Sequence, residues 1–160
     1  MHITKPNRVT HIYRQRLCAP PARVFPLLCP VRETEWADSW LPELVISSSG
    51  VAERDCIFIT PDKLGRAIWY ITRHEPARWF VEMLKILPGV TACRVEIQLS
   101  ESRDGCFADV TYSHTSMSSA GDEVVATFTA DHYRRFMQAW EKELNHFLKT
   151  GSRLRDDTAA

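Results

Sequence analysis

The feature that most limits how this chain can fold is an amphipathic stretch at residues 129–150. Thr129 can cap the start of a helix there, and Gly151 can end it. At about 1.5 Å per residue the helix would be roughly 33 Å long, so its apolar face needs a partner as large as a sheet. That face recurs at spacings of three and four residues and consists of Tyr133, Phe136, Met137, Trp140, Leu144, Phe147 and Leu148.

The residues before this helix supply such a sheet. Apolar and polar residues alternate most clearly at 91–100, which is typical of a strand with one buried face. Pro88-Gly89 is a strong turn signal, and we read residues 116–122, SMSSAGD, as a loop. Consecutive strands followed by one helix predict an α+β protein with an antiparallel sheet of about six or seven strands. The expected strands are 9–18, 44–49, 55–60, 66–74, 79–87, 91–100 and 106–116.

A double proline separates the first strand from a helical segment. Pro20 and Pro21 cannot donate sheet hydrogen bonds, and Pro21 suits the first turn of a helix. We therefore expect two short helices from Pro21 to about Trp40. Trp36 and Trp40 are four residues apart, which would place both on one side of a helix.

These motifs resemble the START/SRPBCC superfamily, whose members have the helix-grip fold. The match lies in Ala19, Pro20, Pro21, Val24 and Phe25, and the stretches LLCPVRETEW and LNHFLKTG look like one bacterial subgroup without established activity. The resemblance covers roughly residues 9–151. It implies a curved antiparallel sheet wrapped around the C-terminal helix, two short helices after the first strand, and a cavity for an apolar ligand between sheet and helix.

The bulk composition favours one globular domain. We expect this domain to span residues 1–151, with a disordered tail at 152–160. Lys plus Arg and Asp plus Glu both number 20, so no excess of positive charge suggests a nucleic-acid partner. No stretch reads as a secretory signal or a membrane span. Five cysteines without a C-x-x-C pair indicate reduced thiols in a cytoplasmic protein. We expect neither a metal site nor a cofactor.

Strand alternation suggests which polar side chains point inward. If Leu17 faces the core, Gln15, Tyr13 and His11 on the same strand do too. In the last strand, Tyr112 and His114 share one face with Val110. Histidine and tyrosine in an apolar cavity could bind a ligand or act as general acid and base. They could equally bond to one another or lie at the rim of the sheet. The four catalytic candidates are His11, Tyr13, Tyr112 and His114.

A larger set could line the cavity. Pockets for small molecules are mostly apolar and aromatic, and the long helix carries several such side chains. Plain core packing explains the same pattern, and the bulky tryptophans would leave a small cavity. We interpret Glu33, Glu35 and Asp38 as a charged helix face. The candidate ligand-binding residues are Tyr13, Trp36, Trp40, Phe58, Trp69, Tyr112, His114, Tyr133, Phe136, Met137 and Trp140.

Three functions fit these observations. The first is binding of a small hydrophobic or amphipathic molecule, lipid-like or polyketide-like, by a monomer or homodimer that does not insert into membranes. The alternatives are an enzyme of the polyketide cyclase, aromatase or dehydratase type and a co-chaperone-like interaction module. A void above about 300 Å³ would favour binding or catalysis, and a filled core with an exposed apolar patch would favour interaction.

Overall fold

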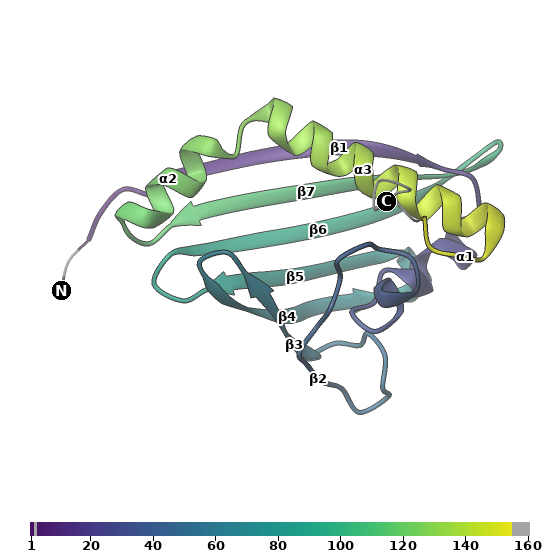
Figure 1. The fold of residues 1–160 in the computed structure, drawn as a ribbon, viewed down its shortest axis with the longest axis horizontal. Helices are drawn as coiled ribbons and strands as arrows, with labels where there is room; N and C mark the ends of the chain where they lie inside the picture. Colours follow the sequence, from purple (N-terminus) through teal and green to yellow (C-terminus); the bar gives the residue numbers. More distant parts are fainter. Residues whose placement is uncertain (2, 155–160) are drawn as a thin grey trace, which may run out of the picture.

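A computed structural model describes residues 1 and 3–154. Its centre is a seven-stranded antiparallel sheet in the order β1-β7-β6-β5-β4-β3-β2, shown in Figure 1. Strands β2 to β7 therefore form an antiparallel meander, and β1 pairs with β7 at the edge of the sheet. The strands are β1 Arg8–Leu17, β2 Leu44–Ile46, β3 Ile57–Asp62, β4 Gly65–Glu75, β5 Phe80–Leu87, β6 Thr91–Ser102 and β7 Gly105–Ser116.

The long helix α3, Ala130–Thr150, lies across one face of the sheet. Thr129 caps it by accepting a hydrogen bond from the His132 amide, and Gly151 ends it in a left-handed conformation. Its buried side chains pack against β1 on the inner face of the sheet. The Tyr133 hydroxyl also donates to the carbonyl of Val110, at 2.6 Å, which ties α3 to β7.

The predicted fold class is confirmed: the molecule has an α+β helix-grip architecture with short helices after the first strand. Strand boundaries agree within a few residues, and β2 is shorter than expected. No helix in the described part of the chain is long and apolar enough to cross a membrane. Of the tail predicted to be disordered, residues 155–160 lie outside the described residues. Within the described part, Arg153 donates a hydrogen bond to the carbonyl of Thr34.

One helix was not predicted. The segment read as a loop contains the start of α2, Ser119–Thr127, which packs against β7. Ser118 caps this helix by accepting from the Gly121 amide at 3.3 Å, so the serines that suggested a loop are a helix start. Gly121 is needed for packing, because a Cβ there would lie 2.0 Å from the Val90 carbonyl oxygen.

The segment after β1 is less regular than the expected helices. It consists of the helix α1, Pro21–Val24, and the 3-10 turns η1, Phe25–Leu27, and η2, Arg32–Glu35. Trp36 follows η2 directly, and Trp40 lies in the loop beyond it. The prediction that one helix presents both tryptophans on one side was therefore wrong. Trp36 is fully buried, whereas Trp40 is partly exposed.

Candidate functional site

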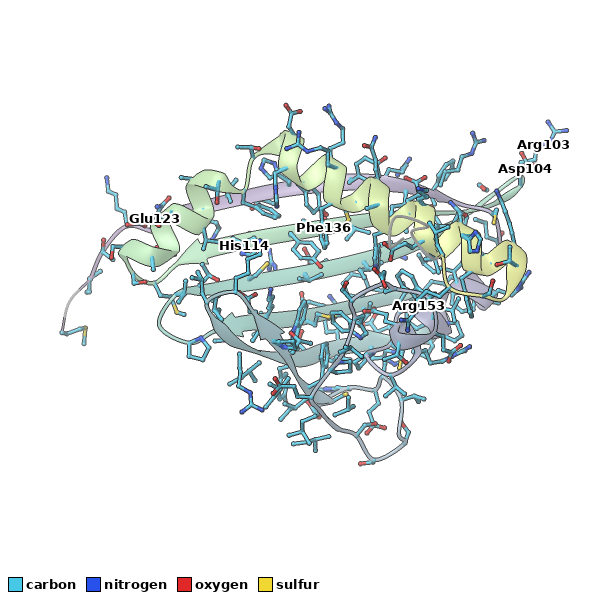
Figure 2. The ribbon with its side chains drawn as sticks, viewed as in Figure 1. Arg103, Asp104, His114, Glu123, Phe136 and Arg153 are labelled. Carbon is cyan, nitrogen blue, oxygen red and sulfur yellow. The ribbon has the colours of Figure 1, made fainter. Side chains whose placement is uncertain are left out.

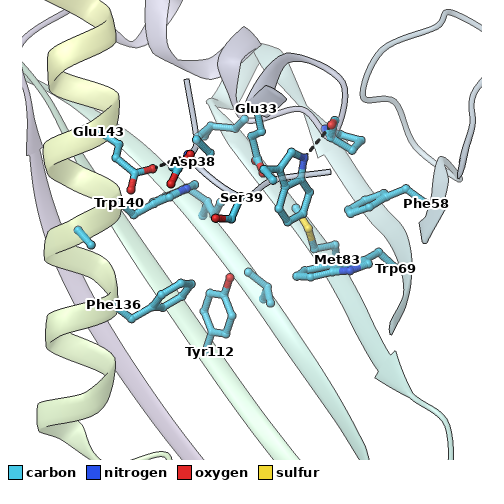
Figure 3. Close-up of a pocket in the computed structure, with 17 residues that line it drawn as sticks. Glu33, Asp38, Ser39, Phe58, Trp69, Met83, Tyr112, Phe136, Trp140 and Glu143 are labelled. Atoms are coloured by element: carbon cyan, nitrogen blue, oxygen red, sulfur yellow. Dashed lines mark hydrogen bonds between the residues drawn. The ribbon is translucent and has the colours of Figure 1, made fainter. Parts of the chain in front are cut away.

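A cavity of about 220 Å³ lies between α3, the turn and loop after β1, and the inner face of the sheet (Figure 3). It is larger than the 150 Å³ or so that holds a benzene molecule in an engineered protein core. Its lining is mostly apolar. The lining residues are Leu28, Pro30, Glu33, Ala37, Asp38, Ser39, Trp40, Phe58, Trp69, Met83, Val95, Ile97, Tyr112, Phe136, Ala139, Trp140 and Glu143.

The floor of the cavity comes from the three neighbouring strands β5, β6 and β7. Successive side chains of a strand point to opposite faces, so every second residue reaches the inner face. Met83 on β5 and Val95 on β6 are directly opposite each other in the register, and Tyr112 on β7 is opposite Val95. All three line the cavity. The inner face of the sheet thus places its apolar side chains under the ligand space.

Three aromatic rings form one wall. Phe58 and Trp69 are stacked, with centroids 5.2 Å apart and an interplanar angle of 13°. Trp40 stands roughly edge-on to both rings, with centroids 6.0 Å from each. Trp40 Nε1 donates to the Pro30 carbonyl at 2.8 Å, and Trp69 Nε1 donates to Thr60 Oγ1 at 2.9 Å. Because these indole N–H groups are already satisfied, the rings offer a ligand their apolar faces.

The helix side forms the mouth. Phe136 belongs to the apolar stripe of α3, yet 45% of its surface is exposed. Its ring meets that of Tyr112 at 83°, with centroids 6.1 Å apart. Figure 3 shows both rings on the α3 side of the cavity, and the Tyr112 hydroxyl points into the open space. Phe136 therefore borders an opening instead of completing the core.

A carboxyl group from η2 faces this apolar space. Glu33 lines the cavity, and its side chain has no hydrogen bond or ion pair with any other described residue. The residue is half-buried and its carboxyl oxygens keep some contact with solvent, yet burial in this mainly apolar lining raises its pKa to about 8. Burial also raises the pKa of Tyr112 well above its usual value, and the nearby Glu33 adds to that effect. Both groups are therefore mainly uncharged at neutral pH.

Two further acidic residues, Asp38 and Glu143, lie at the cavity. The Asp38 amide donates to Glu143 Oε2 at 2.9 Å, which links the loop after η2 to α3. The described lining contains Glu33 besides these two acids, and it contains no Lys, Arg or His. The charge that lines the cavity is thus of one sign.

The structure brings six of the eleven candidate ligand-binding residues to the cavity and places five elsewhere. Trp36 lies in the core, where its Nε1 donates to the Leu27 carbonyl at 3.1 Å and its ring packs 5.2 Å from Trp140. Tyr13 donates to Glu141 Oε2 at 3.2 Å. The six at the cavity are Trp40, Phe58, Trp69, Tyr112, Phe136 and Trp140, and the five elsewhere are Tyr13, Trp36, His114, Tyr133 and Met137.

Neither candidate histidine lines the cavity, and both contact Phe128, which lies between α2 and α3. Figure 2 shows the position of His114. His11 Nε2 is 2.8 Å from the carbonyl oxygen of Phe128. The His114 ring packs against the Phe128 ring with centroids 4.4 Å apart, and its buried Nδ1 has no hydrogen-bond partner among the described residues. The prediction that both histidine side chains point to the inner face of the sheet was therefore correct. The inner face also has a packed region beside Phe128, and the histidines lie there and not at the cavity. Of the four catalytic candidates, only Tyr112 reaches the lining.

The interpretation of Glu33 as part of a charged helix face was wrong. A 3-10 turn has about three residues per turn and turns Glu33 toward the cavity, while Glu35 pairs with Arg32 at 2.9 Å outside. Strand alternation in β6 could have found Val95 and Ile97, whereas β5 is apolar on both faces in the sequence and leaves the direction of Met83 undecided. No sequence signal places the remaining lining residues that were not predicted, because they lie in irregular segments or at exposed positions of α3. Those residues are Leu28, Pro30, Ala37, Ser39, Ala139, Asp38 and Glu143.

Comparison with known proteins identifies the fold. No protein-family model matches the chain, and no curated protein matches it. A norcoclaurine synthase structure from Thalictrum flavum superposes with a TM-score of 0.65 at 10% identity, over 94% of this chain and 100% of that chain. A Mesorhizobium loti protein gives a TM-score of 0.61 at 13% identity, over 86% and 98% of the two chains.

A third neighbour is DynU16, a protein of the dynemicin biosynthetic locus. It gives a TM-score of 0.58 at 15% identity, and the match covers 91% of this chain and 48% of that chain. At these identities the likeness establishes the fold alone. The chain has the helix-grip fold shared by Bet v 1-like and SRPBCC proteins.

The buried His114 makes stability depend on pH. Burial lowers its pKa from 6.5 to about 4, so the unfolded chain binds a proton between these values and the folded chain does not. Its contribution is present above pH 6.5 and is lost as pH falls toward 4. At pH 5 the loss is about 2 kcal/mol. We expect His114→Gln to flatten the pH dependence of urea unfolding between pH 6.5 and 4, and an unchanged slope would contradict this assignment.

Glu33 should lower stability at neutral pH. Its folded pKa is raised, so its contribution is fully present below pH 4.5 and is lost as pH rises toward 8. We expect Glu33→Gln to increase the free energy of unfolding at pH 7 by about 3 kcal/mol and to give no gain at pH 4. Urea unfolding at both pH values tests this. The control Glu35→Gln, which removes an exposed ion-pair partner, should not stabilise at either pH.

Proposed function

We propose that this protein binds a small hydrophobic or amphipathic molecule in the cavity between the sheet and α3. The observation that carries the proposal is the cavity itself, which has six aromatic residues around it and is bordered at its mouth by the exposed ring of Phe136. A core built only for packing would bury such a ring. An aromatic side chain left partly in water forgoes part of the roughly 1.5–3 kcal/mol that full burial supplies, and a ligand can recover that part.

The size of the cavity limits the ligand. Its volume of about 220 Å³ is below the roughly 300 Å³ at which typical ligand pockets begin. It suits a single ring with a short substituent, and a longer lipid-like molecule would leave its chain outside the mouth. Burying about 200 Å² of apolar surface is worth about 5 kcal/mol, which corresponds to a Kd on the order of 0.2 mM. Tighter binding needs a polar contribution.

We favour binding over catalysis of the polyketide cyclase, aromatase or dehydratase kind. Such catalysis needs several polar side chains that converge on the ligand. His11, Tyr13 and His114 make their contacts elsewhere on the inner face, so the described lining has no histidine, and its polar side chains are Tyr112, Ser39 and three acidic residues. Membership of the bacterial subgroup, which the motifs LLCPVRETEW and LNHFLKTG suggest, is likewise part of this proposal.

Blocking the mouth tests the binding proposal. Ala139 lies on α3 among the lining residues and is exposed, so Ala139→Trp should fill the opening without disturbing the core. We expect 2-phenylethanol to shift the indole N–H resonances of Trp40 and Trp69 in NMR spectra of the unmodified protein. The substitution should weaken this binding at least tenfold. The matched control is Ala130→Trp, at an exposed position in the first turn of α3, which should bind as before.

A second candidate function, interaction with another protein, is favoured by the outer face of the sheet. Two rows of apolar side chains cross strands β2 to β5 there, and they are in register. Several are unusually exposed: Leu44 by 45%, Ile46 by 54% and Ile68 by 40%. Contiguous exposed apolar surface of this kind is typical of interaction sites. The rows are Leu44, Ile59, Ile68 and Ile86, and Ile46, Ile57, Tyr70 and Leu84.

A second copy of the chain is the partner that we propose for this outer face. The formal net charge is zero, so two copies do not repel each other through their overall charge. Charged side chains of both signs lie beside the rows, as two ion pairs: Arg66 with Glu43 and Arg94 with Glu96. Because a two-fold interface brings the same patch together from both copies, such a mixed rim can complement itself.

A single charge in the apolar rows should separate the copies. We expect the unmodified protein to sediment as a dimer at tens of micromolar, and Ile68→Lys should shift it to a monomer with little loss of fold, because Ile68 points to solvent. Analytical ultracentrifugation measures the change. Ile12→Lys, at an exposed position on the outer face of β1, is the control and should leave the dimer intact. A monomer at every concentration would rule out this interface.

A further inference from the structure

We propose that the cavity selects an organic cation, namely an amine or quaternary ammonium group carried on a small apolar body. This inference rests on the proposed function, because it names the chemical class of the molecule bound in the same cavity. Two independent properties of the lining carry it: the arrangement of its aromatic rings and the sign of its charge.

The rings are arranged as a partial cage. Trp40 meets Phe58 at 64° and Trp69 at 73°, and on the α3 side Tyr112 meets Phe136 at 83°. Two corners of steeply inclined rings thus border one space. A cation within about 6 Å of a ring centroid is attracted by the negative face of the ring, and tryptophan attracts most strongly. Trimethylammonium and similar groups are large enough to touch rings on several sides at once.

The charge of the lining adds the second condition. Glu33, Asp38 and Glu143 all line the cavity, and its described lining has no basic residue. These carboxyl groups do not form a cluster that could hold a metal ion within the part of the chain that is described. Among charged side chains, an anionic ligand would meet only acidic ones in this described lining, and the exposed Asp38 would attract a cation.

One cation does touch the aromatic wall. Lys85 Nζ lies 5.4 Å from the centroid of the Trp69 ring, but it is also 2.9 Å from Asp62 Oδ2. Its charge is therefore compensated within β3 and β5, and Lys85 is not a lining residue. Phe58 stacks on the Trp69 ring from β3 and Lys85 approaches it from β5, so both sides of this ring are occupied, and the cation contacts of a ligand would fall to the other lining rings.

Glu33 supplies the specific partner. A carboxyl group in an apolar wall, without a hydrogen bond or ion pair to the described protein, lacks the positive charge that would stabilise its ionised form. A ligand cation provides that charge. The groups that face the same space are Tyr112 from β7, Asp38 from the loop and Glu143 from α3, and none of them is basic.

Binding should therefore release a proton. In the empty cavity the Glu33 carboxyl is mainly protonated at neutral pH, and a cation converts it to the carboxylate while the proton leaves to solvent. Charge is conserved, since one positive charge enters and one leaves. The affinity for a permanent cation should rise with pH until Glu33 ionises by itself near pH 8. From pH 6 to pH 8 this predicts an increase of up to about fifty-fold.

The test is a charge series measured by isothermal titration calorimetry on the full chain. The cation is benzyltrimethylammonium, whose charge does not depend on pH. The neutral match is neopentylbenzene, in which carbon replaces the nitrogen, and the anion is phenylacetate. At pH 8 we expect the cation to bind at least tenfold more tightly than the neutral compound, and phenylacetate not to bind. Titrations in two buffers of different ionisation enthalpy at pH 6.5 should show release of close to one proton.

Variants assign the effect to Glu33. Glu33→Gln should weaken the cation at least tenfold at pH 8, abolish both the pH dependence and the proton release, and remove the advantage of the cation over the neutral compound. Glu35→Gln, in the same turn but paired with Arg32 at the surface, should behave like the unmodified protein. A cation that binds no better than neopentylbenzene, or a pH dependence that persists in Glu33→Gln, would overturn the inference.

Failure of the inference can be told apart from failure of the proposed function. If neopentylbenzene and benzyltrimethylammonium bind equally well and Ala139→Trp blocks both, the cavity binds ligands but does not select cations. If no compound of the series binds and Ala139→Trp changes nothing, both the proposed function and this inference are overturned.

Discussion

The burial of the apolar face of α3 against the sheet is the interaction on which the rest of the structure depends. Tyr133, Met137, Leu144 and Leu148 are buried there, and each contributes roughly 1.5–3 kcal/mol. Yet α3 packs mainly along β1, at one edge of a seven-stranded sheet. One helix cannot cover so wide a surface. The middle of the inner face is therefore left to the turn and loop after β1, and the cavity lies where these two covers meet.

The sequence predicts regular parts of this molecule well and irregular parts poorly, for a physical reason. Periodicity placed α3 and every strand, because a repeating backbone imposes a repeating pattern on its side chains. Strand alternation also predicted that His11 and His114 point inward, which is correct. Alternation has no information on the position along the sheet, so it could not separate the cavity from the packed region beside Phe128. The direction of Glu33 depends on a single 3-10 turn, which leaves no periodic signal.

Irregular backbone also explains why Trp36 lies in the core whereas Trp40 lies in the cavity wall. Trp36 directly follows η2 and fills the core with its N–H bonded to Leu27, while Trp40 is held in the loop by the Pro30 carbonyl. Their spacing in the sequence suggested one role for both. The two backbone carbonyls that hold them, which no side-chain pattern encodes, give one a packing role and the other a place in the wall.

The wall of the cavity has a practical consequence for finding the ligand. Of the five tryptophans in the chain, Trp40, Trp69 and Trp140 line the cavity and Trp36 packs against Trp140. Most of the intrinsic tryptophan fluorescence of this protein therefore comes from side chains that line the cavity or pack directly on a lining residue. A molecule that enters changes the polarity around those indoles, and a cation or heavy atom quenches them. The protein thus carries its own optical reporter, and compound collections or cell extracts can be screened against it without a label.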